Sequence, residues 1–154
     1  MKCIWSWFGI LVVMLVVIWI GFQRTHAPLP IENEVPKWKI SAETSQAVAQ
    51  MIEVTTPTIN ATVSQPLTVT GRARGGWYFE ASFPVELRDS SGALLAQTIA
   101  QAQWPWMTDT FVPFTATLNY APQPAWSTGT LTLKRSNPSG EPQNDMSLVI
   151  PVQF

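Results

Sequence analysis

Few residues in this sequence could carry out nucleophilic or acid–base chemistry. There is one histidine, His26, and one cysteine, Cys3, and both stand within the first 27 residues. Hydrolysis by a serine or cysteine nucleophile needs a base beside it and a third group that orients the base. His26 lies in a proline-containing stretch far in sequence from later residues, so no catalytic role is expected for it. Without a second histidine or further cysteines, a zinc site is not expected either.

Two carboxylates offer a different kind of chemistry. Glu80 stands between two phenylalanines, and a carboxyl group among aromatic rings can have a raised pKa. Together with Asp109 it could supply the acid and base of an envelope glycan hydrolase. The competing interpretation is structural, with Glu80 bound to Arg72, Arg74 or backbone amides. We favour the structural interpretation and predict a protein that is not an enzyme and holds no cofactor.

A second group of oxygen-bearing side chains surrounds a Pro-Ser-Gly turn near the carboxyl terminus. Its members are Asn137, Glu141, Asn144 and Asp145. Such oxygens could bind calcium, but they lack the regular alternation of a dedicated calcium loop. Asn, Asp, Ser and Gly also favour turns for local backbone reasons. We therefore predict a turn here and no metal site.

Large aromatic side chains are concentrated next to two expected loops. Trp77 and Tyr78 follow a Gly-Gly pair, and Trp104 and Trp106 flank a proline. Alternation along a strand lets only every second side chain face the core, so some of these four must be exposed or cover an end of the domain. Exposed aromatic clusters mark binding surfaces for proteins or glycans. The alternative is that they close the end of a β-sandwich core.

The elements that must position these residues begin with an apolar run at the amino terminus. Residues 4–22 carry no charge and would reach about 28 Å as a helix, close to the hydrocarbon thickness of a bilayer. Tryptophans near both ends suit the membrane interface. A cleaved signal peptide is the alternative, but its apolar core is usually shorter, and the one plausible cleavage site is followed by Pro28. We predict an uncleaved transmembrane signal anchor over residues 1–22.

The positive charges on the two sides of the apolar run give little indication of how this anchor is oriented in the membrane. Lys2 precedes the run, and Arg24, Lys37 and Lys39 follow it, so the positive-inside rule is close to neutral. A very short amino-terminal side and a large carboxyl-terminal part favour export of the latter. We predict a single-pass protein of the cell membrane whose carboxyl-terminal domain is extracytoplasmic.

After the anchor, residues 23–50 show no sustained pattern and contain three prolines, which predicts an extracytoplasmic linker. Residues 41–50 could form a short helix within it, although its apolar face would be thin. From residue 51 the pattern alternates apolar with polar residues, as strands do. The clearest runs are 51–55, 67–70, 83–88, 130–134 and 148–154, separated by Gly, Pro and Asp-Ser-Ser-Gly turns. We predict an all-β domain over 51–154, an antiparallel β-sandwich of about seven strands, with a hairpin loop at 89–92.

Five fragments within this domain occur in a familiar order and spacing. They are 66–75 (PLTVTGRARG), 77–85 (WYFEASFPV), 106–109 with 111–114 (WMTD, FVPF), 137–140 (NPSG) and 150–152 (IPV). The set resembles the bacterial spore germination immunoglobulin-like domain, the second GerMN-associated domain, over residues 52–154. The resemblance implies an immunoglobulin-like sandwich at the cell envelope. It also places the domain outside the membrane, and it brings no catalytic residues.

The charge composition limits the classes of binding partner that we expect. Charged residues make up 12% of the chain, the formal net charge is −1, and no run of Lys or Arg occurs, so nucleic-acid binding is not expected. The leading hypothesis is a membrane-anchored envelope protein whose domain is a non-catalytic binding or assembly module for an envelope protein or a cell-wall glycan. The first alternative is a structural spacer or accessory subunit of a surface complex. The second is the glycan hydrolase.

Overall fold

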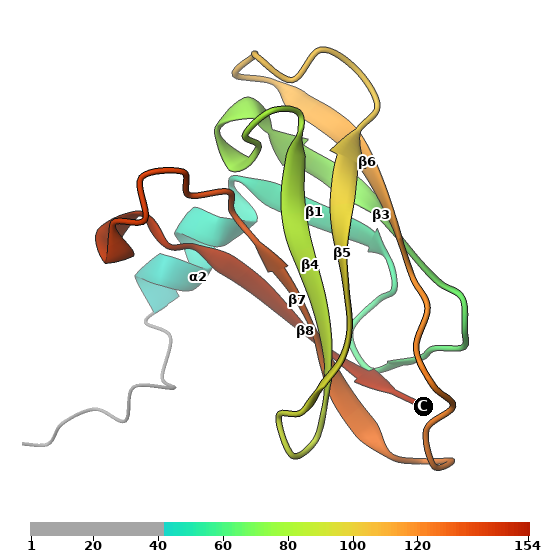
Figure 1. Cartoon of the computed structure of the whole chain (residues 1–154). Helices are drawn as coiled ribbons and strands as arrows, with labels where there is room; N and C mark the ends of the chain where they lie inside the picture. Colours follow the sequence, from blue (N-terminus) through green and yellow to red (C-terminus); the bar gives the residue numbers. More distant parts are fainter. Residues whose placement is uncertain (1–41) are drawn as a thin grey trace, which may run out of the picture. The chain divides into compact units, whose positions relative to one another are not determined.

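A computed structural model describes residues 42–154 of the protein (Figure 1). The predicted anchor over 1–22 and most of the predicted linker lie outside the described residues, as do Cys3 and His26. Within residues 42–154, no helix is long and apolar enough to cross a membrane.

This part of the chain contains one short α-helix, eight strands and two short 3-10 turns, η1 and η2. In chain order they are α2 (Ala42–Ala49), β1 (Ile52–Thr56), β2 (Ala61–Thr62), β3 (Leu67–Arg74), η1 (Gly75–Trp77), β4 (Ser82–Asp89), β5 (Leu94–Ala102), β6 (Phe111–Leu118), β7 (Thr128–Lys134), η2 (Pro142–Asn144) and β8 (Ser147–Gln153). The five strand runs expected from alternation correspond to β1, β3, β4, β7 and β8. The prediction of an all-β domain is confirmed.

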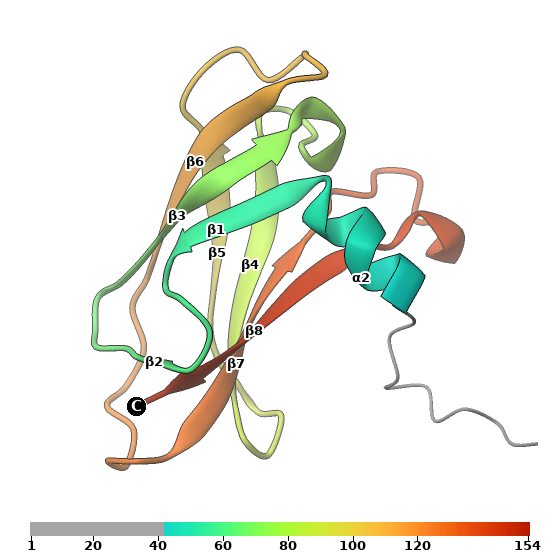
Figure 2. The same ribbon diagram turned by 180° about the vertical axis from the view of Figure 1, so that it is seen from behind.

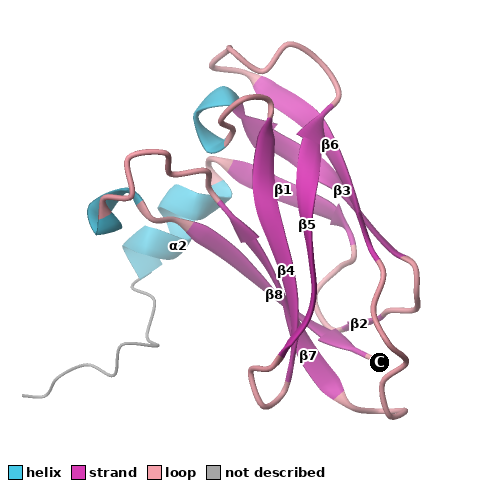
Figure 3. Ribbon diagram, in the orientation of Figure 1, coloured by secondary structure: helices cyan, strands magenta, loops and turns pink. Residues whose placement is uncertain are grey.

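The strands form one curled sheet in the order β1-β3-β6-β5-β4-β7-β8-β2 (Figure 3). Strands β5 and β6 are joined by only two residue pairs, Gln101–Thr115 and Ala102–Phe114. The sheet bends at this short connection into two halves, β1-β3-β6 and β5-β4-β7-β8-β2. The halves pack face to face, since the rings of Phe83 in β4 and Phe114 in β6 lie 4.9 Å apart, edge to face.

The prediction of purely antiparallel pairing is wrong for one short strand. Two-residue β2 runs parallel to β8, with Ala61 opposite Val152. The chain leaves β1 at Pro57 and crosses from one half of the sheet to the far edge of the other, where it meets β8 running in the same direction (Figure 2). All other neighbouring strands are antiparallel.

The core lies between the two halves and follows from alternation. Along β6 every second side chain is buried, namely Val112, Phe114, Ala116 and Leu118. Strands β4, β7 and β8 contribute their own inward residues to the same cluster. Burying one face of each strand removes apolar surface from water at about 25 cal/mol per Å², which is the main stabilising term for the domain.

Helix α2 forms in the segment 41–50, where the sequence allowed a short helix but we predicted a linker. Val48 is buried and joins the core cluster, and its carbonyl accepts a hydrogen bond from the Met51 amide at 2.9 Å. The helix belongs to the same compact unit as the strands. Part of the segment assigned to the linker is therefore folded against the domain.

The hairpin loop expected at 89–92 is confirmed between β4 and β5. The Asp89 carboxylate accepts hydrogen bonds from the Ser91 amide at 2.8 Å and the Ala93 amide at 2.9 Å, and Gly92 adopts a φ of 86°. Aspartate caps the turn because its oxygen reaches the free amides two and four residues later. The positive φ at Gly92 suits a residue without a Cβ.

One carboxylate within the described residues is buried, on the outer face of β4. Glu86 binds Lys134 of β7 and accepts from Arg88 Nη2 at 2.9 Å. The Lys134 ammonium, followed by Arg88, holds the pKa of Glu86 below its usual range, although burial opposes this. The cluster connects β4 to β7 by charge-assisted bonds.

Candidate functional site

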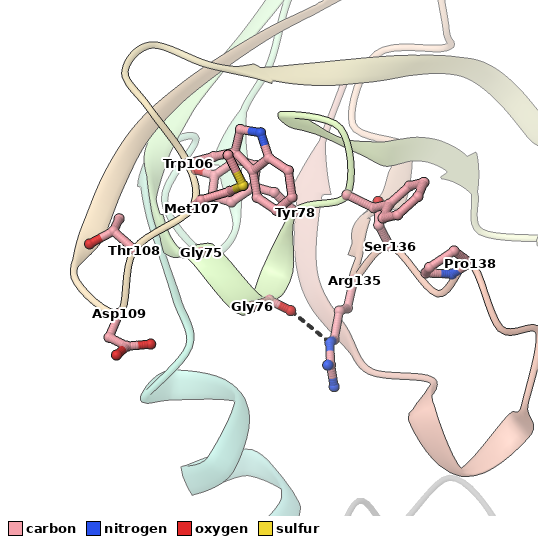
Figure 4. Close-up of a pocket in the computed structure, with 11 residues that line it drawn as sticks. Gly75, Gly76, Tyr78, Trp106, Met107, Thr108, Asp109, Arg135, Ser136 and Pro138 are labelled. Carbon is pink, nitrogen blue, oxygen red and sulfur yellow. Dashed lines mark hydrogen bonds between the residues drawn. The ribbon is translucent and has the colours of Figure 1, made fainter.

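Three loops meet at one end of the domain, and each follows from a strand connection already described. We name them the glycine turn (residues 75–81, between β3 and β4), the tryptophan loop (103–110, between β5 and β6) and the proline loop (135–146, between β7 and β8). Together they line an open groove of about 500 Å³ (Figure 4). Its lining residues are Gly75, Gly76, Tyr78, Phe79, Trp106, Met107, Thr108, Asp109, Arg135, Ser136 and Pro138.

The glycine turn holds the tryptophan loop by close backbone contact. The Gly75 amide donates to the Thr108 carbonyl at 3.1 Å. A Cβ at Gly75 would lie 2.1 Å from that oxygen and 2.3 Å from the Trp106 carbonyl oxygen. Only glycine therefore lets the two segments approach this closely.

Arg74, the last residue of β3, holds the same end of the tryptophan loop one residue further along. Its Nη1 donates to the Asp109 carbonyl at 2.6 Å, and its Nε donates to the Gln50 carbonyl at 2.9 Å. The guanidinium also stands over the Phe111 ring, 4.6 Å from the ring centroid. A charged group that binds backbone carbonyls and an aromatic face together holds this end of the loop to the sheet.

The proline loop is held by two hydrogen bonds to the glycine turn and one to the start of β4. Arg135 Nε donates to the Gly76 carbonyl at 2.9 Å, the contact dashed in Figure 4. The Ser136 amide donates to the Trp77 carbonyl at 3.0 Å, and the Ser136 hydroxyl donates to the Ser82 carbonyl at 2.8 Å. All three loops of the groove are thus fixed to one another or to the sheet, and the groove is preformed.

The oxygen-bearing residues of the proline loop bond to one another. Asn137 Nδ2 donates to the Glu141 carbonyl at 2.9 Å and to Asp145 Oδ1 at 2.8 Å, while Ser139 Oγ donates to Asn137 Oδ1 at 2.6 Å. These bonds are those of a compact turn. Over residues 42–154 no group of three His, Cys, Asp or Glu side chains is placed to hold a metal ion.

The structure divides the four predicted aromatics into two pairs. Trp77 and Tyr78 are 0% and 4% exposed and close the end of the core. Trp77 stands edge-on to Phe83, with ring centroids 6.4 Å apart, and the Tyr78 hydroxyl donates to the Val112 carbonyl at 2.7 Å. Burial raises the pKa of Tyr78 to about 12. Tyr78 still contributes to the groove wall.

The other pair stands on the tryptophan loop. Trp104 is 68% exposed, and Trp106 is half-buried, lining the groove while packing against the core cluster. Two residues that the sequence did not single out add to this surface, Met107 at 83% exposed and Phe79 at 45%. Both adjoin predicted aromatics in sequence, which is the signal that could have found them.

The two carboxylates considered for catalysis are not both in the groove. Asp109 is among the lining residues, whereas Glu80 is exposed with a φ of 51° and is not among them. The expected ion pair of Glu80 with Arg72 or Arg74 is not formed. Arg72 binds Glu53 at 2.7 Å instead, and Arg74 binds backbone carbonyls.

Comparison with known proteins assigns the domain to a family. The family model for the immunoglobulin-like domain of bacterial spore germination matches residues 51–141, more than half of the chain, from the start of β1 to the proline loop. A search of curated proteins and a search of solved structures gave no match. The match includes the glycine turn, the tryptophan loop and the first part of the proline loop. The protein belongs to the family of immunoglobulin-like domains of bacterial spore germination.

Proposed function

We propose that this protein is a membrane-anchored component of the bacterial cell envelope, whose immunoglobulin-like domain is a non-catalytic binding or assembly module in germination or at the cell surface. The apolar run over residues 4–22 supports the anchor. The family supports a role related to germination. The preformed groove supports binding, because a ligand that enters it need not order three loops first.

The observation that carries the proposal is the tryptophan loop. Trp104 and Met107 are 68% and 83% exposed. Their loop is nonetheless held at its start, where the Gln103 amide donates to β6, and near its end, where Gly75 and Arg74 bind backbone carbonyls. When a partner covers large apolar side chains that are held rigidly in water, the free energy of the complex falls, because apolar surface is removed from water. Tryptophan is also among the residues most often found at the energetic centre of interfaces.

The groove also has polar groups beside its apolar lining residues Trp106 and Met107. Arg135, whose Nε donates to the Gly76 carbonyl, lines the groove on one side, and Thr108 and Asp109 line it from the tryptophan loop. Aromatic faces with hydrogen-bonding groups at their margin fit either an envelope protein or a cell-wall glycan. The partner class is therefore one of these two.

The test is crosslinking of the full-length protein in intact cells, followed by recovery of bound protein or peptidoglycan. Trp104→Ala and Met107→Ala should each reduce capture by about tenfold, the loss of one interfacial anchor. Trp126→Ala is the matched control: Trp126 is 87% exposed but lies between β6 and β7, where its amide donates to the carboxyl-terminal residue Phe154. Its replacement should leave capture unchanged.

Capture that is equal in all three variants would reject the tryptophan loop as the binding surface. That result would favour the alternative of a structural spacer or an accessory subunit, which assembles without using these two side chains. Turnover of peptidoglycan that disappears in Glu80→Gln would instead support a hydrolase.

A further inference from the structure

Strand β5 has a partner along one side and little along the other. Its pairing with β4 is regular from Ser82–Gln101 to Leu87–Ala96. Pairing with β6 stops after the two residue pairs at the carboxyl-terminal end of β5, and the two strands separate below that point (Figure 1). From Ala96 to Ala100, β5 is therefore an edge strand within the part of the chain that the structure describes.

Two hydrogen bonds show which peptide groups point out of this edge. The Ala102 amide donates to the Ala81 carbonyl at 2.9 Å and so points toward β4, while the Gln103 amide donates to a β6 carbonyl at 2.8 Å. Peptide groups of successive residues point alternately to the two sides of a strand. Gln97 and Ile99 thus direct their N–H and C=O groups away from β4, and no hydrogen bond from the described residues reaches them.

The edge lacks the features that normally prevent strand pairing. Natural edge strands carry charges, prolines or bulges that keep other chains away. Over Leu94–Ala102 there is no charged residue, proline or glycine, and Leu94 and Ile99 are 48% and 47% exposed. The one register shift in the pairing of β5 with β4 lies between Leu94 and Ala96, outside the open stretch Ala96–Ala100. The edge of β1 carries Glu53 and an irregular register, and β8 carries Pro151. Only β5 leaves a long, uncharged edge open among residues 42–154.

We propose that β5 of one molecule pairs with β5 of a second copy, antiparallel and about a two-fold axis. Gln97 of one copy then lies opposite Ile99 of the other, and each such pair exchanges two backbone hydrogen bonds. An uncharged strand meets itself without like-charge repulsion, whereas a charged peptide would find no opposite charge on this strand. The exposed Ile99 side chains gain apolar contact across the new pair. No β5 residue lines the loop groove, so this surface is separate from the proposed binding site.

The first experiment measures the mass of the full-length protein in detergent across a range of concentrations by analytical ultracentrifugation. The wild type should dimerise, and Ile99→Lys should raise the dimer dissociation constant by at least about tenfold. Val149→Lys is the matched control, since Val149 is 43% exposed on the outer face of β8, away from this edge. Its dissociation constant should equal that of the wild type.

A second pair of variants separates edge pairing from folding. Gln97→Pro removes an N–H that points into solvent, so pairing with β4 should persist and the circular dichroism of the domain should be retained while the dimer is lost. Thr98→Pro removes an N–H that points toward β4 and should disrupt the fold. A wild-type protein that is monomeric up to about 100 μM, or a dimer that survives in both Ile99→Lys and folded Gln97→Pro, would overturn the proposal.

Discussion

Replacing Trp77 tests whether it belongs to the core or to the binding surface. Trp77 is fully buried beside Phe83, so Trp77→Ala removes a large core side chain and leaves a cavity. Such substitutions lower the free energy of unfolding by about 3–5 kcal/mol. Trp104→Ala removes a side chain that is 68% exposed and should change that free energy by no more than about 0.5 kcal/mol.

The indole nitrogen of Trp77 affects how much stability a replacement should cost. Among the described residues, Nε1 has no hydrogen-bond acceptor, and an unpaired buried donor costs about 1–3 kcal/mol. Trp77→Phe removes that donor and keeps an aromatic ring. It should therefore be much milder than Trp77→Ala, with a loss of about 1 kcal/mol, because the smaller ring still leaves part of the volume empty.

The assay is urea unfolding of the full-length protein in detergent, followed by the β-sheet signal in circular dichroism. In a domain of this size, 3 kcal/mol corresponds to a fall in Tm of about 12 °C or more, so thermal unfolding gives an independent check. The reasoning is refuted if Trp77→Ala unfolds within about 1 kcal/mol of the wild type, or if Trp104→Ala is equally damaging.

Three further substitutions test the supports of the groove and the sheet. Gly75→Ala should lower the free energy of unfolding by about 1–3 kcal/mol, because its Cβ would clash with the tryptophan loop. The loop should be released and cleaved faster by a protease. An unchanged rate of cleavage would contradict the close contact. Tyr78→Phe should cost about 1 kcal/mol through the lost bond to Val112. Because its folded pKa is raised to about 12, Tyr78 stabilises the fold fully below its unfolded pKa and loses that contribution as the pH rises from about 10 to 12, which ultraviolet titration can follow. The pKa of Glu86 is lowered by folding, so its contribution to stability is present above its unfolded pKa of about 4.3 and is lost as the pH falls through its folded pKa. Glu86→Gln should therefore flatten the dependence of the free energy of unfolding on pH in that range. An unchanged acid profile would argue against the pair with Lys134.

Sequence reasoning located most of the strands because their side chains alternate toward one core. Strand β6 shows the same alternation, but in β5 the inward-facing residues are not the hydrophobic ones. Its inward positions are the small residues Ala96 and Ala100, while Ile99 points outward and is 47% exposed. A hydrophobic pattern inverted in this way cannot be recognised before the neighbouring strands are known.

The aromatic site shows the same limit. Alternation implied that Trp77 and Tyr78 could not both be buried, yet both are, because the 3-10 turn at Gly75–Trp77 interrupts the strand period. The first residue of this turn, Gly75, also bonds to Thr108 in the tryptophan loop, more than thirty positions away. The sequence by itself determined the strand-rich domain, its family and the loops that carry the tryptophans. Only the tertiary structure decided which tryptophans face water, because exposure depends on how distant loops pack and not on the local pattern.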